Sequence, residues 1–295
     1  MKNNIKYLNR LAVSLILFAI LQFQNHIVFA QEPILKKIKE VEQRLGGARI
    51  GMATYDLETG KRLQYNADQL FPLSSTFKVF LCGAILGKVD KGKEKLSRTV
   101  RYSREQIVSY SPVTKDNIPN GMTVGELCHS TVTMSDNTAA NLLMETIGGP
   151  GGLTDFMKDL GDKITRIDRW ETELNQGKPE DVRDTTTPNA ALTSLHKLLF
   201  GKILSERSKQ QLATWMIQDQ VAASLFRKNL PEGWKIGDKT GAGGYGSRSI
   251  IAVIWPPKRK PVIATLYITG NKASFKERNM AIADIGQALF LSLEK

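Results

Sequence analysis

Four short motifs, in a fixed order along the chain, contain the groups needed for acyl transfer without histidine. Ser75 and Lys78 are one helical turn apart, so a hydroxyl nucleophile would have an amine beside it. Ser135 adds a second hydroxyl, Glu171 a carboxylate and Lys239 a second amine, and such groups relay protons or bind anions. The set indicates attack by Ser75 on a carbonyl, followed by hydrolysis of a covalent intermediate.

Each motif alone also has a purely structural reading. Ser-x-x-Lys occurs twice, at Ser75 and at Ser194, so the pattern by itself is not specific. Serines that precede helices are often caps, and Glu171 in a loop could be an ordinary surface charge. The joint occurrence of the motifs in this order favours catalysis. With two histidines, His129 and His196, beyond the first thirty residues and no histidine or thiol cluster, the sequence predicts no metal site.

The first three motifs lie at the starts of helices or in a long loop. An apolar run follows Ser75, which predicts that this serine begins a helix whose N–H groups face a developing anion. Ser135 precedes a second predicted helix, residues 138–147. Glu171 falls in residues 165–187, a segment without periodicity that reads as a functional loop. An ion pair between Arg169 and Asp184 could close this loop.

The fourth motif, which begins at Lys239, ends a predicted strand and opens a glycine-rich run, residues 241–246. This run matches the G-x-G-x-x-G pattern of dinucleotide sites, but that pattern must open a helix. Residues 249–255 read as a strand instead, so we expect a hairpin turn with its edge open to a ligand. The sequence therefore predicts no nucleotide cofactor.

Both ends of the chain predict strands with one helix, whereas the middle predicts helices. We expect an α+β fold: an α/β sandwich whose antiparallel sheet is built from both chain ends, plus an all-helical domain, with the active site in the cleft between them. The α/β domain would comprise residues 31–66 and 218–295, and the helical domain residues 67–217. The predicted strands are residues 48–55, 61–65, 234–238, 247–255 and 262–268; the terminal helices are residues 32–45 and 274–293.

Residues 1–30 have the pattern of a signal peptide. A basic start precedes an apolar stretch too short to span a bilayer, and a small-residue cleavage site falls near Ala30-Gln31. A retained membrane anchor is the alternative. We expect a secreted, periplasmic protein with no membrane association after cleavage. Three leader cations reduce the formal charge from +12 to +9, and because the remaining cations are scattered, nucleic-acid binding is not predicted.

Two cysteines, Cys82 and Cys128, suit an oxidising compartment. A bridge between them would tie the helix of Ser75 to the segment before Ser135. The alternative is a pair of buried free thiols. The sequence leaves both possibilities open, and we expect the bridge.

With these motifs, the chain resembles class A serine β-lactamases over essentially its whole mature length. The resemblance extends to residues 110–113, to residues 184–188 and to the cysteine pair. It implies a serine β-lactamase and penicillin-binding-protein-like fold, a small-molecule β-lactam substrate, no cofactor and a monomer. The implied product is a β-lactam with its amide hydrolysed, which confers β-lactam resistance.

The resemblance also implies a role for each matching residue. Ser75 would attack the lactam carbonyl, and the N–H groups of Ser75 and Ala242 would hold the oxyanion. Ser135 would pass a proton to the lactam nitrogen, and Glu171 would activate the deacylating water. Either Lys78 or Glu171 would serve as the acylation base. The implied substrate-binding residues are Tyr110, Asn137, Asn175, Lys239, Thr240, Gly241 and Arg248.

Two stretches, residues 248–255 and 277–279, further resemble the carbenicillin-hydrolysing branch, which usually has arginine where this chain has Lys239. We expect hydrolysis of penicillins and of some cephalosporins. Two alternatives share the serine and lysine motifs: a D-alanyl-D-alanine peptidase, which does not need Glu171, and a penicillin sensor that stays acylated. A sensor would normally hang from transmembrane helices, and none is predicted after the leader.

Overall fold

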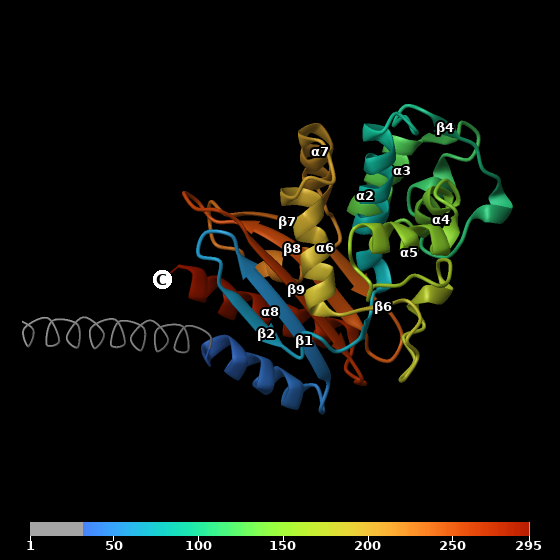
Figure 1. Cartoon of the computed structure of the whole chain (residues 1–295). Helices are drawn as coiled ribbons and strands as arrows, with labels where there is room; N and C mark the ends of the chain where they lie inside the picture. The colour runs from blue at the N-terminus through green and yellow to red at the C-terminus, as the bar shows by residue number, and fades with distance from the viewer. Residues whose placement is uncertain (1–31, 295) are drawn as a thin grey trace, which may run out of the picture.

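The computed structural model describes residues 32–294, so the predicted signal peptide lies outside the described residues. A five-stranded antiparallel sheet has the strand order β2-β1-β9-β8-β7, and helices lie on both of its faces (Figure 1). The first and last strands of the chain therefore pair side by side. The strands are β1 Arg49–Asp56, β2 Arg62–Tyr65, β7 Lys235–Ala242, β8 Arg248–Trp255 and β9 Val262–Thr269.

The central strands are buried on both faces because each face supports a separate core. Side chains of a strand alternate between faces, so Ile250 and Ile254 of β8 join one cluster, whereas Ile251 and Val253 join the other. The helix of residues 32–44 and α8 Phe275–Leu293 cover the first face. Helix α6, Pro188–Phe200, covers the second. Ser274 and Glu277 form a capping box at the start of α8.

The helical part surrounds α2, Phe77–Asp90, whose residues from Phe77 to Gly87 are all buried. Burial on every side requires a helix that is apolar all round, as this sequence is. Helices α3, α4, α5, α6 and α7 contact α2. Their bounds are α3 Val124–Thr133, α4 Asn137–Glu145, α5 Gly149–Asp159 and α7 Glu206–Ile217.

The expected α+β fold is confirmed, with three local differences. Helix α5 was not predicted, because its glycine-rich start hid a helix that begins with Pro150 in its first turn. Two short strand pairs interrupt the helical part: β3 Phe71–Pro72 with β6 Thr185–Thr186, and β4 Thr99–Val100 with β5 Met122–Thr123. Strand β7 continues through the fourth motif to Ala242 instead of ending before it. The domain limits at residues 67 and 217 stay predictions.

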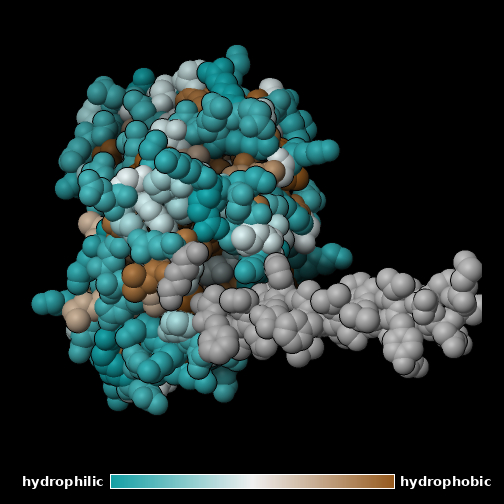
Figure 2. All heavy atoms as spheres, turned by 90° about the vertical axis from the view of Figure 1, so that its left-hand side faces the viewer, coloured by the Kyte–Doolittle hydropathy of each residue, from teal (hydrophilic) through white to brown (hydrophobic). Residues whose placement is uncertain are grey.

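Hydrophilic residues predominate on the face of the protein seen in Figure 2. Within residues 32–294, no helix combines the length and the apolar character needed to cross a membrane.

Candidate active site

A cleft of about 300 Å³ opens where the helical part meets the edge of the sheet at β7. Most of the sequence-predicted residues line it, although they come from five separate segments, whereas Lys78, Glu171 and Lys239 are buried and do not line it. Two lining residues, Val221 and Phe275, were not predicted. The cleft is lined by Ser75, Tyr110, Ser135, Asn137, Asn175, Val221, Thr240, Gly241, Ala242, Arg248 and Phe275.

Ser75 lies in a single 3-10 turn, η1 Ser74–Thr76, directly before α2. The helix that Ser75 was predicted to begin therefore opens as a 3-10 turn, and the α-helix itself starts two residues later, at Phe77. Thr76 fixes the turn by donating its hydroxyl to the carbonyl of Leu73, 2.7 Å away. The turn packs against β7, and Ser75 is half-buried at the cleft.

Lys78 lies in the first turn of α2 with no exposed side-chain surface. Its Nζ donates to the Ser135 carbonyl at 2.8 Å and to Asn137 Oδ1 at 2.5 Å. The Nζ also lies 2.9 Å from Glu171 Oε1 and 3.5 Å from Ser135 Oγ. Burial lowers the pKa of Lys78, and the charge of Glu171 opposes that shift. The Lys78 amine therefore contacts residues of the second and third motifs while it belongs to the first.

The loop with Ser135 is held by its neighbour Asp136. Asp136 caps α4 by accepting the Ala139 N–H at 2.9 Å, and it also accepts the N–H groups of Val113 and Thr114. Ser135 adopts a left-handed φ of 59°. The predicted capping role at this motif thus belongs to Asp136, which leaves the Ser135 hydroxyl at the cleft.

Asn137, which follows, uses much of its amide inside the protein. Its Oδ1 accepts from Lys78, and its Nδ2 donates to the Ser109 carbonyl at 2.8 Å. Because an amide nitrogen carries two hydrogens, one N–H remains for another acceptor. Asn137 can thus hold Lys78 and still present a donor to the cleft.

The loop of residues 165–187 is closed at its base, as the sequence suggested. Arg169 Nε lies 2.6 Å from Asp184 Oδ2, and the other carboxylate oxygen of Asp184 accepts the N–H groups of Asp168 and Arg169. The pairing of β3 with β6 adds a short ladder there. The loop is therefore an ordered element that can place a side chain accurately.

Glu171 is the side chain that this loop buries in the site. Asn141 of α4 forms two hydrogen bonds with the backbone of Glu171. Asn141 Oδ1 accepts the Glu171 N–H at 2.9 Å, and Asn141 Nδ2 donates to the Glu171 carbonyl at 3.0 Å. Glu171 Oε2 accepts from Asn175 Nδ2 at 2.5 Å. The turn η4, Glu173–Asn175, packs against the turn that carries Ser75. Asn141 is a positioning residue that the sequence analysis missed.

Two more cations lie under the β7 side of the cleft. Lys239 is fully buried, and burial lowers its pKa to about 8 despite the charge of Asp219. Arg248 donates to the Gly241 carbonyl at 2.8 Å and to Asn279 Oδ1 at 2.7 Å. Burial lowers its pKa to about 10. Desolvated cations at a cleft concentrate positive potential there, which favours an anionic ligand.

The glycine-rich run is a hairpin turn between β7 and β8, as expected, and it is also a packing site. A side chain at Gly241 would meet the Leu73 carbonyl at 3.1 Å and Ser74 Cβ at 2.9 Å. A side chain at Gly244 would overlap the Gln176 carbonyl. Glycine is therefore required where the turn of Ser75 and the loop of Glu171 approach the sheet edge.

The predicted Cys82–Cys128 bridge is wrong for this structure, in which both cysteines are free and buried. The sequence did place them side by side, on the contacting helices α2 and α3. The Cys82 thiol, however, points to the Cys128 carbonyl, 3.7 Å away. Burial raises the pKa of Cys128 well above its usual value, which suppresses the thiolate that disulfide chemistry needs.

The second Ser-x-x-Lys pattern is structural. Ser194 is buried within α6 and donates to Asp162 Oδ2 at 2.7 Å, whereas Lys197 donates to the Leu160 carbonyl. Among residues 32–294, no group of three histidine, cysteine or acidic side chains is arranged to hold a metal ion.

The fold brings Ser75 to a cleft and buries the carboxylate of Glu171 and the amines of Lys78 and Lys239, which are group types that a serine acyl-transfer enzyme needs. The model of the Beta-lactamase enzyme family matches residues 33–293. The chain belongs to this family and, by its structural matches, to its class A.

Solved class A β-lactamases align with nearly the whole described chain. The ancestral enzyme GNCA is 46% identical with a TM-score of 0.86, over 88% of this chain and 99% of that one. The class A β-lactamase of the last common ancestor of Gram-negative bacteria (GNCA4) is 45% identical with a TM-score of 0.87, and the alignment covers 88% of this chain and 99% of that one. The putative class A β-lactamase PenP from Rhodopseudomonas palustris is 43% identical with a TM-score of 0.85, over 87% and 98%.

Proposed function

We propose that this protein hydrolyses the lactam amide of penicillins, and of some cephalosporins, through an acyl-enzyme on Ser75, and that it thereby confers β-lactam resistance. The observation that carries the proposal is the buried carboxylate of Glu171, which lies 2.9 Å from Lys78 Nζ and accepts from Asn175. A carboxylate held in this way is suited to activate water and so to complete turnover.

Acylation begins with transfer of the Ser75 proton to a base. Lys78 follows Ser75 by one helical turn, and burial lowers its pKa towards the neutral amine that could accept a proton. Glu171, in contact with Lys78, is the second group placed to take it. As the carbonyl becomes tetrahedral, the N–H groups of Ser75 and Ala242 would hold the oxyanion, and each such donor is worth about 10²–10³ in rate.

The leaving nitrogen then needs a proton. Ser135 lines the cleft, and its hydroxyl lies 3.5 Å from Lys78 Nζ, so a proton on Lys78 could pass through Ser135 to the lactam nitrogen. In this relay Ser135 donates to the nitrogen and is reprotonated by Lys78. When Lys78 is the base, the proton that leaves Ser75 is thereby replaced by one delivered to the nitrogen of the opened ring.

Substrate orientation would follow from the charges and amides at the rim. Lys239, Thr240 and Arg248 would receive the substrate carboxylate, since two of them are desolvated cations. The free N–H of Asn137 would bind the side-chain amide, and exposed Tyr110 would form one wall. Gly241 allows the substrate backbone to approach the strand edge closely.

Deacylation would use a water activated by Glu171. Asn175 donates to Glu171 Oε2, while its own Oδ1 is buried without a hydrogen-bond partner in the described chain. Such an acceptor is suited to orient a water beside the carboxylate. Glu171 would take a proton from that water as it attacks the ester, and the proton would return to Ser75.

A D-alanyl-D-alanine peptidase is the competing function, because it could use the same serines and lysines. The buried Glu171, gripped by Asn141 and Asn175, favours hydrolysis over a long-lived acyl-enzyme. The deciding experiment is steady-state hydrolysis of a penicillin, a cephalosporin, a carbapenem and a D-alanyl-D-alanine peptide by the purified protein, with Ser75→Ala as control. Turnover of the peptide without turnover of the penicillin would reject the proposal.

The remaining expectations concern the protein outside its site. We propose secretion to the periplasm after cleavage near Ala30-Gln31, and a monomeric state. Class A β-lactamases are generally secreted, which supports the first of these proposals. N-terminal sequencing and light scattering of the exported protein test them.

A further inference from the structure

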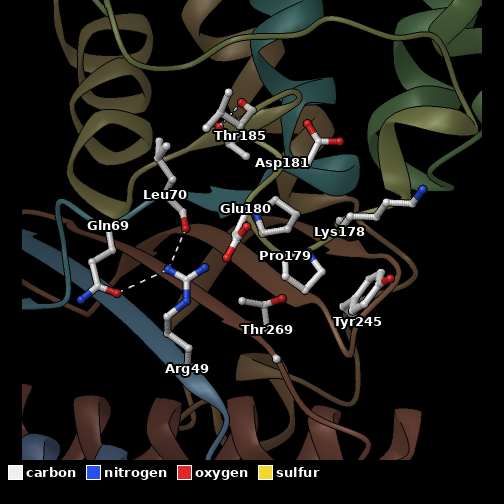
Figure 3. Close-up of a pocket in the computed structure, with 14 residues that line it drawn as sticks. Arg49, Gln69, Leu70, Lys178, Pro179, Glu180, Asp181, Thr185, Tyr245 and Thr269 are labelled. Atoms are coloured by element: carbon white, nitrogen blue, oxygen red, sulfur yellow. Dashed lines mark hydrogen bonds between the residues drawn. The ribbon is translucent and has the colours of Figure 1, made fainter.

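A second pocket, of about 480 Å³, lies on the outer side of the loop of residues 165–187. It shares no lining residue with the active-site cleft. Its walls come from the start of β1, the segment around β3, the outer part of the loop, and the turns at residues 245 and 270 (Figure 3). This volume falls within the range of small-ligand sites.

Much of the wall is apolar. Leu70, Val182 and Tyr245 are large hydrophobic side chains that remain exposed on the protein surface, by 37%, 48% and 51%. Here they line one cavity together with Pro72 and Pro179. Exposed hydrophobic side chains that gather in a concave site mark a place where an apolar body can bind.

One guanidinium points into this apolar pocket. Arg49 stacks on the buried ring of Phe71, with its Cζ 4.1 Å from the ring centroid. Its Nη1 donates to the Leu70 carbonyl at 2.7 Å and to Gln69 Oε1 at 3.4 Å. Figure 3 shows both bonds on one side of the guanidinium, with the other side turned towards Pro179 and Glu180.

The N–H groups on that other side, at Nε and Nη2, have no acceptor among residues 32–294, and Arg49 forms no ion pair there. Nε and Nη2 form one flat edge that matches the two oxygens of a carboxylate. The stacked ring and the two Nη1 bonds fix that edge in advance, so little side-chain entropy is lost on binding.

Of the other charged residues in the pocket, some would attract a bound anion and others would repel it. Asp181 is already paired, with Arg183 at 2.9 Å and with Arg169 at 3.6 Å. Glu180 lines the pocket without an ion pair in the described chain, and it would repel a bound anion. Lys178 adds a cation on the same loop. Arg49 is thus the cation with the fixed geometry, and Glu180 is the group that limits affinity.

We propose that this pocket binds small organic carboxylates with an apolar body, the carboxylate on the Nε–Nη2 edge of Arg49 and the body against Leu70, Val182 and Tyr245. The site does not depend on the hydrolytic reaction, because its residues are separate from those of the cleft. Residues 177–182 of the loop that carries Glu171 line the pocket, so a ligand would contact the loop in the conformation described here.

The test is a titration of the mature protein with phenylacetate, followed by amide chemical shifts, with uncharged phenylacetamide as the matched ligand. We expect shifts at Gly177, Val182, Tyr245 and Gly270 with a dissociation constant on the order of 1 mM, and much weaker shifts with phenylacetamide. Arg49→Gln should weaken phenylacetate binding about tenfold or more, since a bidentate charge-assisted contact is lost. Glu180→Gln should strengthen it about two- to fivefold, since a repulsive charge is removed.

Arg207→Gln removes an exposed arginine of α7, outside both pockets, and should leave binding unchanged. Thermal melting of each variant, together with its penicillin turnover, shows whether the fold is retained. The proposal is overturned if phenylacetate shifts only cleft residues such as Thr240, if phenylacetamide binds as tightly, or if a folded Arg49→Gln protein binds as the parent does.

Discussion

Lys78 and Glu171 form an ion pair of 2.9 Å in which neither side chain has any exposed surface. A buried pair of this kind is costly to assemble, and removal of one partner leaves an uncompensated charge, typically at a cost of about 3–5 kcal/mol. The pair joins α2, which directly follows the turn of Ser75, to the loop of residues 165–187. It therefore couples the residues proposed for acylation to the group proposed for deacylation.

Replacing Glu171 by alanine should separate the two half-reactions. We expect the variant to acylate with a penicillin and then to stall, with deacylation about 10²–10⁴ slower because a positioned base is lost. Intact-mass measurement after mixing should show a persistent adduct. Glu173→Ala, an exposed acid two residues further along the loop, is the control and should turn over normally. Clearance of the adduct at the parent rate would remove Glu171 from the mechanism.

Replacing Lys78 by methionine should block the first half-reaction. Methionine has a similar length but cannot accept the Ser75 proton, so acylation should fall by about 10²–10⁴. Stopped-flow mixing with a penicillin measures this rate, and Glu171→Gln measured in parallel identifies the base: retained acylation there assigns the role to Lys78. Lys197→Met, in the structural Ser-x-x-Lys pattern, should have no effect on acylation. Normal acylation by Lys78→Met would contradict the role of this amine.

Penicillin binding should weaken at alkaline pH. Lys239 has a pKa of about 8 in the fold, below the usual lysine value of about 10.4, so it is charged below pH 8 and neutral above. An anionic substrate would thus lose attraction as the pH rises through about 8, and KM should increase several-fold between pH 7 and pH 9.5.

Lys239→Arg provides the matched variant for this titration. A guanidinium stays charged over that range, so the alkaline rise in KM should move to higher pH. The measurement is a pH profile of KM for both proteins in one buffer series. An unchanged profile in Lys239→Arg would show that another group titrates.

Gly241→Ala should damage the site through packing. The added methyl would lie 2.5 Å from Ser249 Oγ and 3.1 Å from the Leu73 carbonyl, so the turn of Ser75 must move away from β7. Because the nucleophile and the Ala242 N–H belong to these two elements, we expect kcat/KM to fall about 10²-fold. Gly151→Ala, at an exposed position of α5 without a left-handed φ and with nothing within 4 Å, controls for the substitution itself. A fully active Gly241→Ala protein would contradict the claim that close packing of the Ser75 turn on β7 is needed for activity.

The two cysteines should behave as buried thiols. Both are fully buried and unpaired, so a thiol probe should not label the native protein. Unfolding without reductant should expose two reactive thiols per chain. If the unfolded protein yields none, the cysteines are bridged in solution.

The candidate site residues and the two kinds of region, strands with terminal helices and a helical middle, could be predicted from the sequence, because both depend on residue types and their order along the chain. Helix starts give strong short-range signals, as Ser274 with Glu277 does before α8. The β-branched and aromatic residues of β8, set between glycine- and proline-bearing turns, likewise predicted a strand. Helix α5 and the short strand pairs were missed, since glycines and two-residue strands give little local signal.

The tertiary structure alone decided which groups meet, because the contacts join segments distant in the chain. The grip of Asn141 on Glu171, the burial of Lys78 and Lys239 with their lowered pKa values, and the thiol state of Cys82 all depend on packing between elements. No pattern of neighbouring residues encodes such contacts. The sequence by itself determined the types and order of the reacting groups, whereas their protonation and mutual orientation depend on the low-dielectric environment that the folded chain creates.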